Sequence, residues 1–310
     1  MAARILVTGG AGFIGSTIAD RCVGAGWDVA VVDDLSSGKR ENVPEQARFY
    51  PCDVRSAAAA EAVERERPDV LCHHAAQIDV RRSMADPRYD VDVNLGGLVN
   101  LLAAAGRAGV RHVLFASSGG AAYGESTRLP TPEDEPTHPV SVYGASKAAS
   151  ELFLGVWHAS HGIGFTALRY GNVYGPRQDP HGEAGVVAIF AGRLLDGQPC
   201  TVNGDGTQTR DYVYVDDVAR ANLLAAERRP QGALNVGTGV ETDVNRIYRV
   251  LANAAGVPAE ALRGPGKAGE QRRSCIDPAA AGRVLGWRPE VPLEEGLRRT
   301  LEWFRARRKG

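Results

Sequence analysis

Residues 5–15 read ILVTGGAGFIG, a short apolar run followed by a turn rich in glycine. A helical pattern then continues to about Ala25, so the segment predicts a strand, a tight turn and a helix. Gly9, Gly12 and Gly15 allow the sharp turn and let backbone N–H groups approach a pyrophosphate, to which the helix N-terminus adds partial positive charge. The segment is therefore typical of a dinucleotide-binding site.

An acidic residue follows this turn at the distance that a dinucleotide site requires. The next predicted strand, Asp28–Val32, ends in Asp33, where a carboxylate would bond the ribose hydroxyls of adenosine. Asp33 and Asp34 together would repel a 2′-phosphate, which favours NAD over NADP, although Lys39 and Arg40 lie near enough in sequence to weaken this preference. The alternative, two acids that only cap a strand, is less favoured because turn and acid occur in the expected order and spacing.

Strand-like and helical segments continue to alternate along the chain. Apolar runs that end in small or polar residues fall at residues 70–72, 113–115 and 165–168, and helices are predicted over residues 84–105 and 142–161. This alternation predicts an α/β fold with a doubly wound, Rossmann-like parallel sheet, and it places ligands beyond the carboxyl ends of the strands.

The domain organisation follows from where this alternation weakens. Residues 1–171 are predicted to form the NAD-binding domain, with later returns near residues 211–239. Residues 172–310 would form mainly a smaller, interleaved domain for the substrate. Within them, residues 175–185 are rich in Pro, Gly and Asp and predict a loop of the kind that closes over a ligand.

Composition excludes several classes of protein. The net charge of −1 over 310 residues gives no basic footprint that would argue for nucleic acid, and no apolar run reaches membrane-spanning length. The N-terminus runs directly into the glycine turn, so no signal peptide is expected. The five cysteines are scattered without a CxxC pair, which indicates reduced thiols and a cytoplasmic location.

The sequence contains two pairs of closely spaced histidines, a pattern that can bind a metal ion. His73 and His74 are adjacent on a predicted strand and would point to opposite faces, which makes a poor chelate. His158 and His161 share a helix face, but no acidic or cysteine ligands accompany either pair. We therefore expect no metal.

Residues 141–147 read SVYGASK and place Tyr143 four residues before Lys147 in a predicted helix, so that both side chains share one face. A free tyrosine has a pKa of about 10, and a lysine cation beside it favours the phenolate. Such a pair can exchange a proton with a substrate hydroxyl. The alternative is an ordinary tyrosine beside a surface lysine. Against it, lysine occurs at only four positions, compared with 32 arginines, so a lysine at this spacing is informative.

These segments together resemble a known family. The motifs are TGGAGFIG, VVDDLSSG, HHAAQ, SSGGAAYG, YGASK, LRYGNVYGPRQ and NGDGTQTRDYVYVDDV. They resemble the extended short-chain dehydrogenase/reductase family, and within it the bacterial UDP-galactose (UDP-glucose) 4-epimerases, over the whole chain. The resemblance implies NAD as cofactor, a UDP-sugar as substrate and a homodimer.

The mechanism that the resemblance implies assigns a role to each part of the site. Tyr143 would remove the proton of the sugar C4 hydroxyl while NAD accepts the C4 hydride, and both would return after the 4-keto sugar presents its other face. Lys147 would bond the nicotinamide ribose. The cofactor site would comprise Gly9, Gly12, Phe13, Ile14, Gly15, Asp33, Asp34, Ser36, Ser37, Gly38, Asp53, Val54, Ala75, Ala76, Gln77, Asn94, Ser117, Tyr143, Lys147 and Tyr170. The substrate site would comprise Ser118, Gly119, Tyr143, Asn172, Arg210, Arg272 and Ser274.

The chain departs from the family pattern beside the tyrosine. The family places a Ser or Thr that assists proton transfer four residues before the tyrosine of its xYG motif, and that position is Gly119 here. Ser118 or Ser117 would replace this hydroxyl as a catalytic helper, or water would. Related dehydratases and decarboxylases carry an acid two residues before the same tyrosine, where this chain has Ala121, so epimerisation is favoured over them.

The sequence leaves open which UDP-sugars are substrates. Aligning Gly269–Glu270 with the Gly-Asp of the family puts Ser274 where a tyrosine can exclude an N-acetyl group. Serine leaves room, so UDP-N-acetylhexosamines are expected to enter beside UDP-glucose and UDP-galactose. A UDP-glucuronate epimerase and, least favoured, a non-catalytic NAD-binding regulator are the remaining alternatives.

Overall fold

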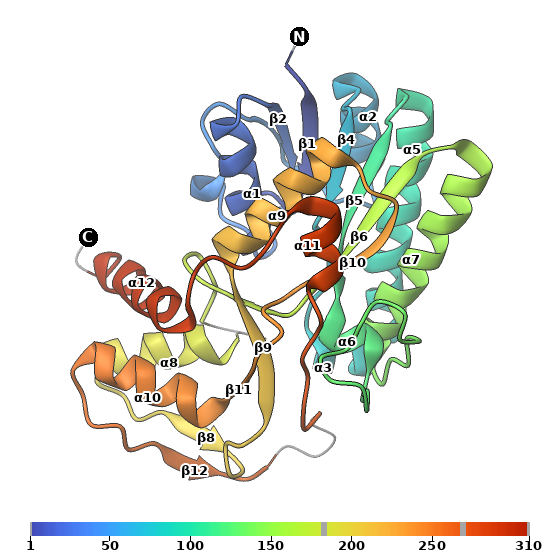
Figure 1. Cartoon of the computed structure of the whole chain (residues 1–310). Coiled ribbons are helices and arrows are strands. Elements are labelled where there is room, and N and C mark those ends of the chain that lie inside the picture. Colours follow the sequence, from blue (N-terminus) through green and yellow to red (C-terminus); the bar gives the residue numbers. More distant parts are fainter. Residues whose placement is uncertain (1, 181–184, 267–270, 309–310) are drawn as a thin grey trace.

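A seven-stranded parallel sheet forms the centre of the molecule, and the computed structural model describes residues 2–180, 185–266 and 271–308 (Figure 1). The strand order is β3-β2-β1-β4-β5-β6-β10, the doubly wound order of dinucleotide-binding folds. The strands are β1 Arg4–Thr8, β2 Asp28–Val32, β3 Arg48–Tyr50, β4 Val70–His73, β5 His112–Ser118, β6 Gly164–Tyr170 and β10 Gly232–Val236. The predicted fold class is confirmed.

Helices cover both faces of this sheet, which explains why strands such as β2, with the sequence DVAVV, are buried almost throughout. One face packs against α1 (Phe13–Gly24), α9 (Val215–Arg228) and α11 (Ala279–Leu285). The other packs against α2 (Ala57–Glu66), α5 (Gly97–Ala108) and α7 (Val142–His161). Two separate apolar cores result, with the alternate residues of each strand contributing to opposite faces.

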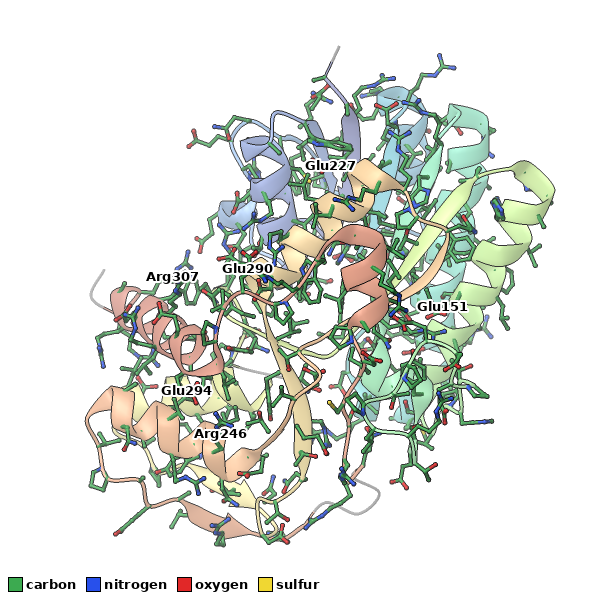
Figure 2. All side chains as sticks on the ribbon, viewed as in Figure 1. Glu151, Glu227, Arg246, Glu290, Glu294 and Arg307 are labelled. Atoms are coloured by element: carbon green, nitrogen blue, oxygen red, sulfur yellow. The ribbon has the colours of Figure 1, made fainter. Side chains whose placement is uncertain are left out.

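A smaller unit with its own core lies beyond the carboxyl ends of the strands (Figure 1). Its helices are α8 (Val186–Leu195), α10 (Val244–Ala255) and α12 (Leu293–Ala306). Its strands are β7 (Asn172–Tyr174), β8 (Thr201–Asn203), β9 (Thr209–Tyr214), β11 (Glu241–Asp243) and β12 (Leu262–Gly264). Arg246 of α10 pairs with Glu294 of α12 at 2.7 Å, and both are labelled in Figure 2.

The chain passes between the two units more than once. Helix α9 and strand β10 return to the main sheet, where β10 pairs with β6, while β9 stays in the small sheet beside β7 and β11. Helix α11 then packs on the main sheet before α12 returns to the smaller unit. Segments from both halves of the sequence can therefore meet at the carboxyl ends of the central strands.

The predicted helix over residues 84–105 is broken in the structure. It consists of α3 (Val80–Ala85), α4 (Pro87–Val91), a π-helical turn (Asp92–Gly96) and α5. Asp86 caps α4 by accepting from Tyr89 N–H, and Pro87, which has no N–H to donate, begins it. Periodicity predicted the helical character correctly but could not show these interruptions.

The loop predicted over residues 175–185 lies partly outside the described residues, since 181–184 are not described. Within the described chain, no helix combines the length and the apolar character needed to cross a membrane. All five cysteines are free thiols.

Candidate active site

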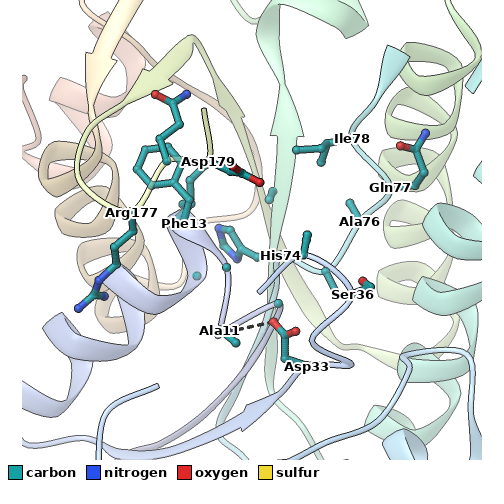
Figure 3. A pocket seen from close by; sticks show the side chains of 18 of the residues that line it. Ala11, Phe13, Asp33, Ser36, His74, Ala76, Gln77, Ile78, Arg177 and Asp179 are labelled. Carbon is teal, nitrogen blue, oxygen red and sulfur yellow. Dashed lines mark hydrogen bonds between the residues drawn. The ribbon is translucent and has the colours of Figure 1, made fainter. Parts of the chain in front are cut away.

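A cavity of about 760 Å³ opens at the carboxyl ends of the parallel strands, and α12 of the smaller unit contributes to its wall (Figure 3). This volume is typical of a cofactor site, for which about 300–1,000 Å³ is usual. Of the residues expected to hold the cofactor, those lining the cavity are Gly9, Gly12, Phe13, Ile14, Gly15, Asp33, Asp34, Ser36, Ser37, Asp53, Val54, Ala75, Ala76, Gln77, Ser117, Tyr143, Lys147 and Tyr170.

The glycine turn at one end of the cavity requires its glycines. Gly9 has φ +68°, and a Cβ there would lie 2.6 Å from the backbone nitrogen of Ala75. A Cβ on Gly15 would collide with the Gly9 carbonyl oxygen. The first turn of α1 therefore packs directly against the strand ends and leaves its N–H groups facing the cavity.

Asp33 lies at the end of β2 beside this turn. Its Oδ2 accepts from Ala11 N–H at 2.9 Å, drawn in Figure 3, and its Oδ1 accepts from Leu35 N–H at 2.8 Å. Burial raises the pKa of Asp33, and these two backbone bonds oppose that shift. The carboxylate is thus held in place by the loops on either side while it still lines the cavity.

Gly38 and Asn94 belong to the expected cofactor set but do not line the cavity. A Cβ on Gly38 would lie 2.9 Å from Asp33 Oδ1, so glycine lets the chain pass close behind that carboxylate. Asn94 is buried and holds Gln77, accepting from its N–H at 2.8 Å and donating to its carbonyl at 3.0 Å. Asn94 therefore contributes to the wall through Gln77.

Tyr143 and Lys147 lie on the first turns of α7 and line the cavity together. Ser141 begins the helix by accepting from Gly144 N–H at 3.1 Å. Lys147 is buried, its Nζ donates to the Ala116 carbonyl at 2.9 Å, and it lies 5.7 Å from the centroid of the Tyr143 ring.

Burial opposes the charged form of both groups. It lowers the pKa of Lys147 to about 8, against the charges of Asp90 and then Glu151, which raise it. Burial first, and the charge of Asp90 second, raise the pKa of Tyr143. This direction is opposite to the one expected from a neighbouring lysine, because burial disfavours the charged phenolate.

The two serines before α6 (Gly119–Tyr123) have different partners. Ser117 lines the cavity, and its hydroxyl donates to Glu151 Oε1 at 2.6 Å. Glu151, labelled in Figure 2, pairs with Arg169 at 2.6 Å. The Ser118 Oγ accepts from Ala121 N–H at 3.2 Å, so its own O–H remains available for another acceptor.

The expected substrate residues other than Tyr143 do not line this cavity and form two groups. The first is near α6. A Cβ on Gly120 would lie 3.4 Å from Ser274 Oγ, and one on Gly119 would lie 2.8 Å from Ile276 Cγ2. Residues 274–276 therefore pack directly over the start of α6, which explains why the chain carries glycine there.

The second group lies on the smaller unit. Asn172 begins β7 and is exposed, and β7 pairs with β9, which contains Arg210. Arg272 forms an ion pair of 2.9 Å with Asp205 in the Gly-Asp-Gly turn and also bonds Thr207 Oγ1. Gly269–Glu270, used above to align Ser274, lie outside the described residues.

Sequence reasoning missed the contribution of α12 and of Arg177. Trp303 and Phe304 of α12 line the cavity together with Arg307 and Arg308, which directly follow the helix. Arg177 pairs with Asp20 of α1 at 2.7 Å and donates to Ser16 Oγ at 3.0 Å. Arg177 stands in the motif LRYGNVYGPRQ, which was a signal that could have identified it.

The chain is similar to characterised proteins over almost its full length. The profile of the NAD-dependent epimerase/dehydratase family matches residues 5–237. A UDP-glucose 4-epimerase of Mycolicibacterium smegmatis is 46% identical over 308 residues, covering 97% of this chain and 98% of the relative.

Solved structures agree with this similarity. The UDP-glucose 4-epimerase of Thermotoga maritima with UDP-glucose is 46% identical with a TM-score of 0.96, covering 98% of this chain and 99% of the other. The UDP-glucose 4-epimerase of Thermus thermophilus in complex with NAD is 47% identical with a TM-score of 0.92, covering 97% and 99%. The chain therefore belongs to the NAD-dependent epimerase/dehydratase family.

Proposed function

We propose that this chain inverts the C4 centre of a UDP-hexose, interconverting UDP-glucose and UDP-galactose with tightly held NAD. The observation that carries the proposal is the position of Tyr143 and Lys147 in one wall of a cavity whose other end is the glycine turn with Asp33. The UDP-glucose 4-epimerases similar to this chain over nearly full length support the substrate class.

The glycine turn and the polar side chains that line the cavity suit NAD. A Cβ on Gly9 or Gly15 would collide with the backbone of Ala75 or of Gly9, so only glycine allows the tight turn that a pyrophosphate site needs. Asp33 would bond the ribose hydroxyls of adenosine, and Lys147 would bond the ribose on the nicotinamide side. NAD bound there would accept a hydride from the sugar C4 and give it back, which is the redox chemistry that inversion at C4 requires.

Tyr143 would take the proton of the C4 hydroxyl and later return it. Because burial raises its pKa, the tyrosine needs nearby positive charge to act as a base, and the Lys147 ammonium supplies part of it. Ser118, whose own O–H is available, is our candidate for the helper hydroxyl.

Elimination chemistry is less well supported than epimerisation. Loss of water from the sugar needs an additional acid near the reacting carbons, and Ala121 stands where related dehydratases carry one. The two preceding positions, Gly119 and Gly120, have no side chain, and residues 274–276 pack closely over them. The Tyr–Lys–NAD set is sufficient for inversion alone.

The same contacts favour a broad sugar site. Ser274 is a small side chain that packs against Gly120, at the position where a tyrosine would restrict the sugar C2 substituent. We infer that N-acetylated hexoses also fit, because serine at position 274 lacks the ring with which a tyrosine would exclude the N-acetyl group.

We further propose a homodimer built on α7 and α4. Leu152 and Val156 lie one turn apart on α7 and are 74% and 61% exposed. Phe153, also on α7, and Val91 at the end of α4 are exposed as well. Clusters of exposed apolar side chains on a globular protein commonly mark an interface, and a two-fold dimer would bury these four on both copies. Leu152→Asp with Val156→Asp should give a monomer in light scattering, whereas Leu262→Asp, on the smaller unit, should not.

The test of the proposed function is direct. Purified protein is incubated separately with UDP-glucose, UDP-galactose, their N-acetylated forms and UDP-glucuronate, and the C4 epimers are separated. Conversion in both directions without added cofactor supports the proposal. Conversion of UDP-glucuronate alone, or formation of a dehydrated sugar, would replace it. We expect the enzyme in the cytoplasm, where its five free thiols would remain reduced.

A further inference from the structure

Asp90 is a fully buried carboxylate on α4 without a charged partner among the described residues. Its Oδ2 accepts from Gln77 Nε2 at 3.0 Å and from Asn94 Nδ2 at 3.1 Å. Its Oδ1 has no hydrogen-bond partner within the described structure. An anion buried in this way is costly, so its retention needs a physical reason.

A chain of hydrogen bonds connects Asp90 to the catalytic helix. Asn94 lies in the π-helical turn Asp92–Gly96, and its Nδ2 lies 3.4 Å from Ser146 Oγ. The Ser146 hydroxyl donates to the carbonyl of Tyr143 at 2.9 Å. Asp90 and Asn94 together also hold Gln77, which lines the cavity next to α7.

The other charged or titratable groups around Tyr143 and Lys147 are neutral, paired or engaged elsewhere. Burial lowers the pKa of His73 and of His74 to about 3, so both are neutral near pH 7. Glu151 is neutralised by Arg169. On the elements packed against α7, Tyr89, Tyr123 and Tyr170 are phenols, and the Arg82 guanidinium lies over the Tyr89 ring. Asp79 and Asp86 accept from backbone N–H groups at the starts of α3 and α4, and Arg88 pairs with Asp92 at 3.8 Å.

We propose that Asp90 is a positioning residue for the Tyr143–Lys147 pair. Its buried carboxylate holds the cavity-lining Gln77 and, through Asn94 and Ser146, the backbone of α7 at Tyr143, and its charge acts on the pair from behind that wall. Its effect on the pH dependence of turnover rests on the proposed function, whereas its effect on the titration of Lys147 does not. The proposal goes beyond the family motifs, because Asp90 lies outside all of them.

The direction of the effect follows from the sign of the charge. A buried anion near Lys147 stabilises the ammonium, so it keeps the cation present to higher pH than burial alone would allow. The same anion disfavours the Tyr143 phenolate, so the tyrosine stays protonated until positive charge arrives with the cofactor. Asp90 would thereby hold Lys147 cationic at the pH at which Tyr143 must exchange its proton.

The first test titrates Lys147 without any sugar. Protein labelled with ¹³Cε-lysine contains four lysines, so Lys147 can be followed by NMR in the cofactor-loaded protein. Asp90→Asn keeps the shape and an acceptor for Gln77 and Asn94 but removes the charge. The Lys147 midpoint should fall by about one pH unit, a size expected from one nearby charge. Asp92→Asn, the same change at an exposed position two residues on, should leave it unmoved.

The second test is the pH dependence of turnover. In Asp90→Asn both limbs of the profile should move to lower pH, since loss of the anion lowers the proton affinity of Lys147 and of Tyr143. Should Asp90→Asn not fold, Asp90→Ser removes the same charge with a smaller side chain. An unchanged Lys147 midpoint in either variant overturns the inference and leaves Asp90 a structural clamp. Absence of epimerisation in wild type, with a moved midpoint, would instead count against the proposed function alone.

Discussion

The hydroxyl of Ser117 donates a 2.6 Å hydrogen bond to Glu151, which lies one turn beyond Lys147 on α7 and is itself paired with Arg169. The Ser117 proton is therefore committed to a structural network that joins β5, α7 and β6. Ser117 lines the cavity, whereas its neighbour Ser118 lies outside that lining and, in the described structure, uses its Oγ to accept from Ala121 N–H, which leaves its O–H for another acceptor. The position of a hydroxyl and its availability for catalysis thus differ between these two residues.

Ser118→Ala is expected to slow turnover about tenfold, the worth of one hydrogen bond of about 1.4 kcal/mol. Because Ser118 also caps α6, thermal melting must be measured beside the rate, and Ser118→Thr, which keeps both functions, serves as the control. If Ser117→Ala is the more damaging change at equal stability, the helper assignment moves to Ser117.

Gly119→Ser, in contrast, is not expected to raise the rate. Its Cβ would lie 2.8 Å from Ile276 Cγ2, so the new side chain would displace the segment over α6 before its hydroxyl could act. Steady-state rates and melting temperature of the variant check this. A faster, equally stable enzyme would show that the segment moves easily.

Tyr143→Phe is expected to reduce turnover by about 10²–10⁴-fold while NAD stays bound, because only the proton carrier is lost. The rate on the best UDP-sugar and the NAD content of the denatured variant are the two measurements. Near-normal turnover would show that another group carries the proton.

NAD, and not NADP, should be recovered when the purified protein is denatured. Asp33 and Asp34 line the cavity and would repel a 2′-phosphate. Asp33→Asn removes the charge but keeps an acceptor for one of the two backbone hydrogen bonds. The ratio of NADP to NAD dissociation constants, measured on cofactor-free protein, should fall in this variant. A wild-type preference for NADP would contradict the assignment.

Ser274→Tyr should remove activity on UDP-N-acetylhexosamines and spare UDP-glucose and UDP-galactose. The tyrosine ring would have to extend beyond Gly120, against which Ser274 now packs, and would occupy space near the sugar. Epimerisation of both sugar types is compared in wild type and variant. An unchanged ratio between them would show that Ser274 is not the gate.

Acid should destabilise the chain through His73. Burial lowers the pKa of His73 to about 3, while in the unfolded chain it lies near 6.5. Between these values the unfolded state binds the extra proton, so the stability contributed by the neutral imidazole is present above about pH 6.5 and is lost as pH falls toward 3. The melting temperature of His73→Gln should vary less steeply with pH over this window, whereas that of the exposed His161→Gln should follow wild type.

Local spacing accounts for what could be predicted. The glycine turn and Asp33 are short-range features whose backbone geometry follows from residue type, and both lie where expected. Helix α7 begins at Val142, and its i, i+4 spacing places Tyr143 and Lys147 on one face in any fold that keeps the helix. The sequence by itself therefore determined the doubly wound sheet and the centre of its site.

Tertiary packing decided the rest, because the relevant contacts join residues far apart in the chain. Ser117 differs from Ser118 only through Glu151, 34 residues away, and the cavity gains its outer wall from α12 near the C-terminus. Asp90 reads as one acid among many in a helical stretch; its burial, and an Oδ1 that has no hydrogen-bond partner within the described structure, give it meaning. Desolvation and long-range contact cannot be read from spacing, since both depend on which surfaces the completed fold brings together.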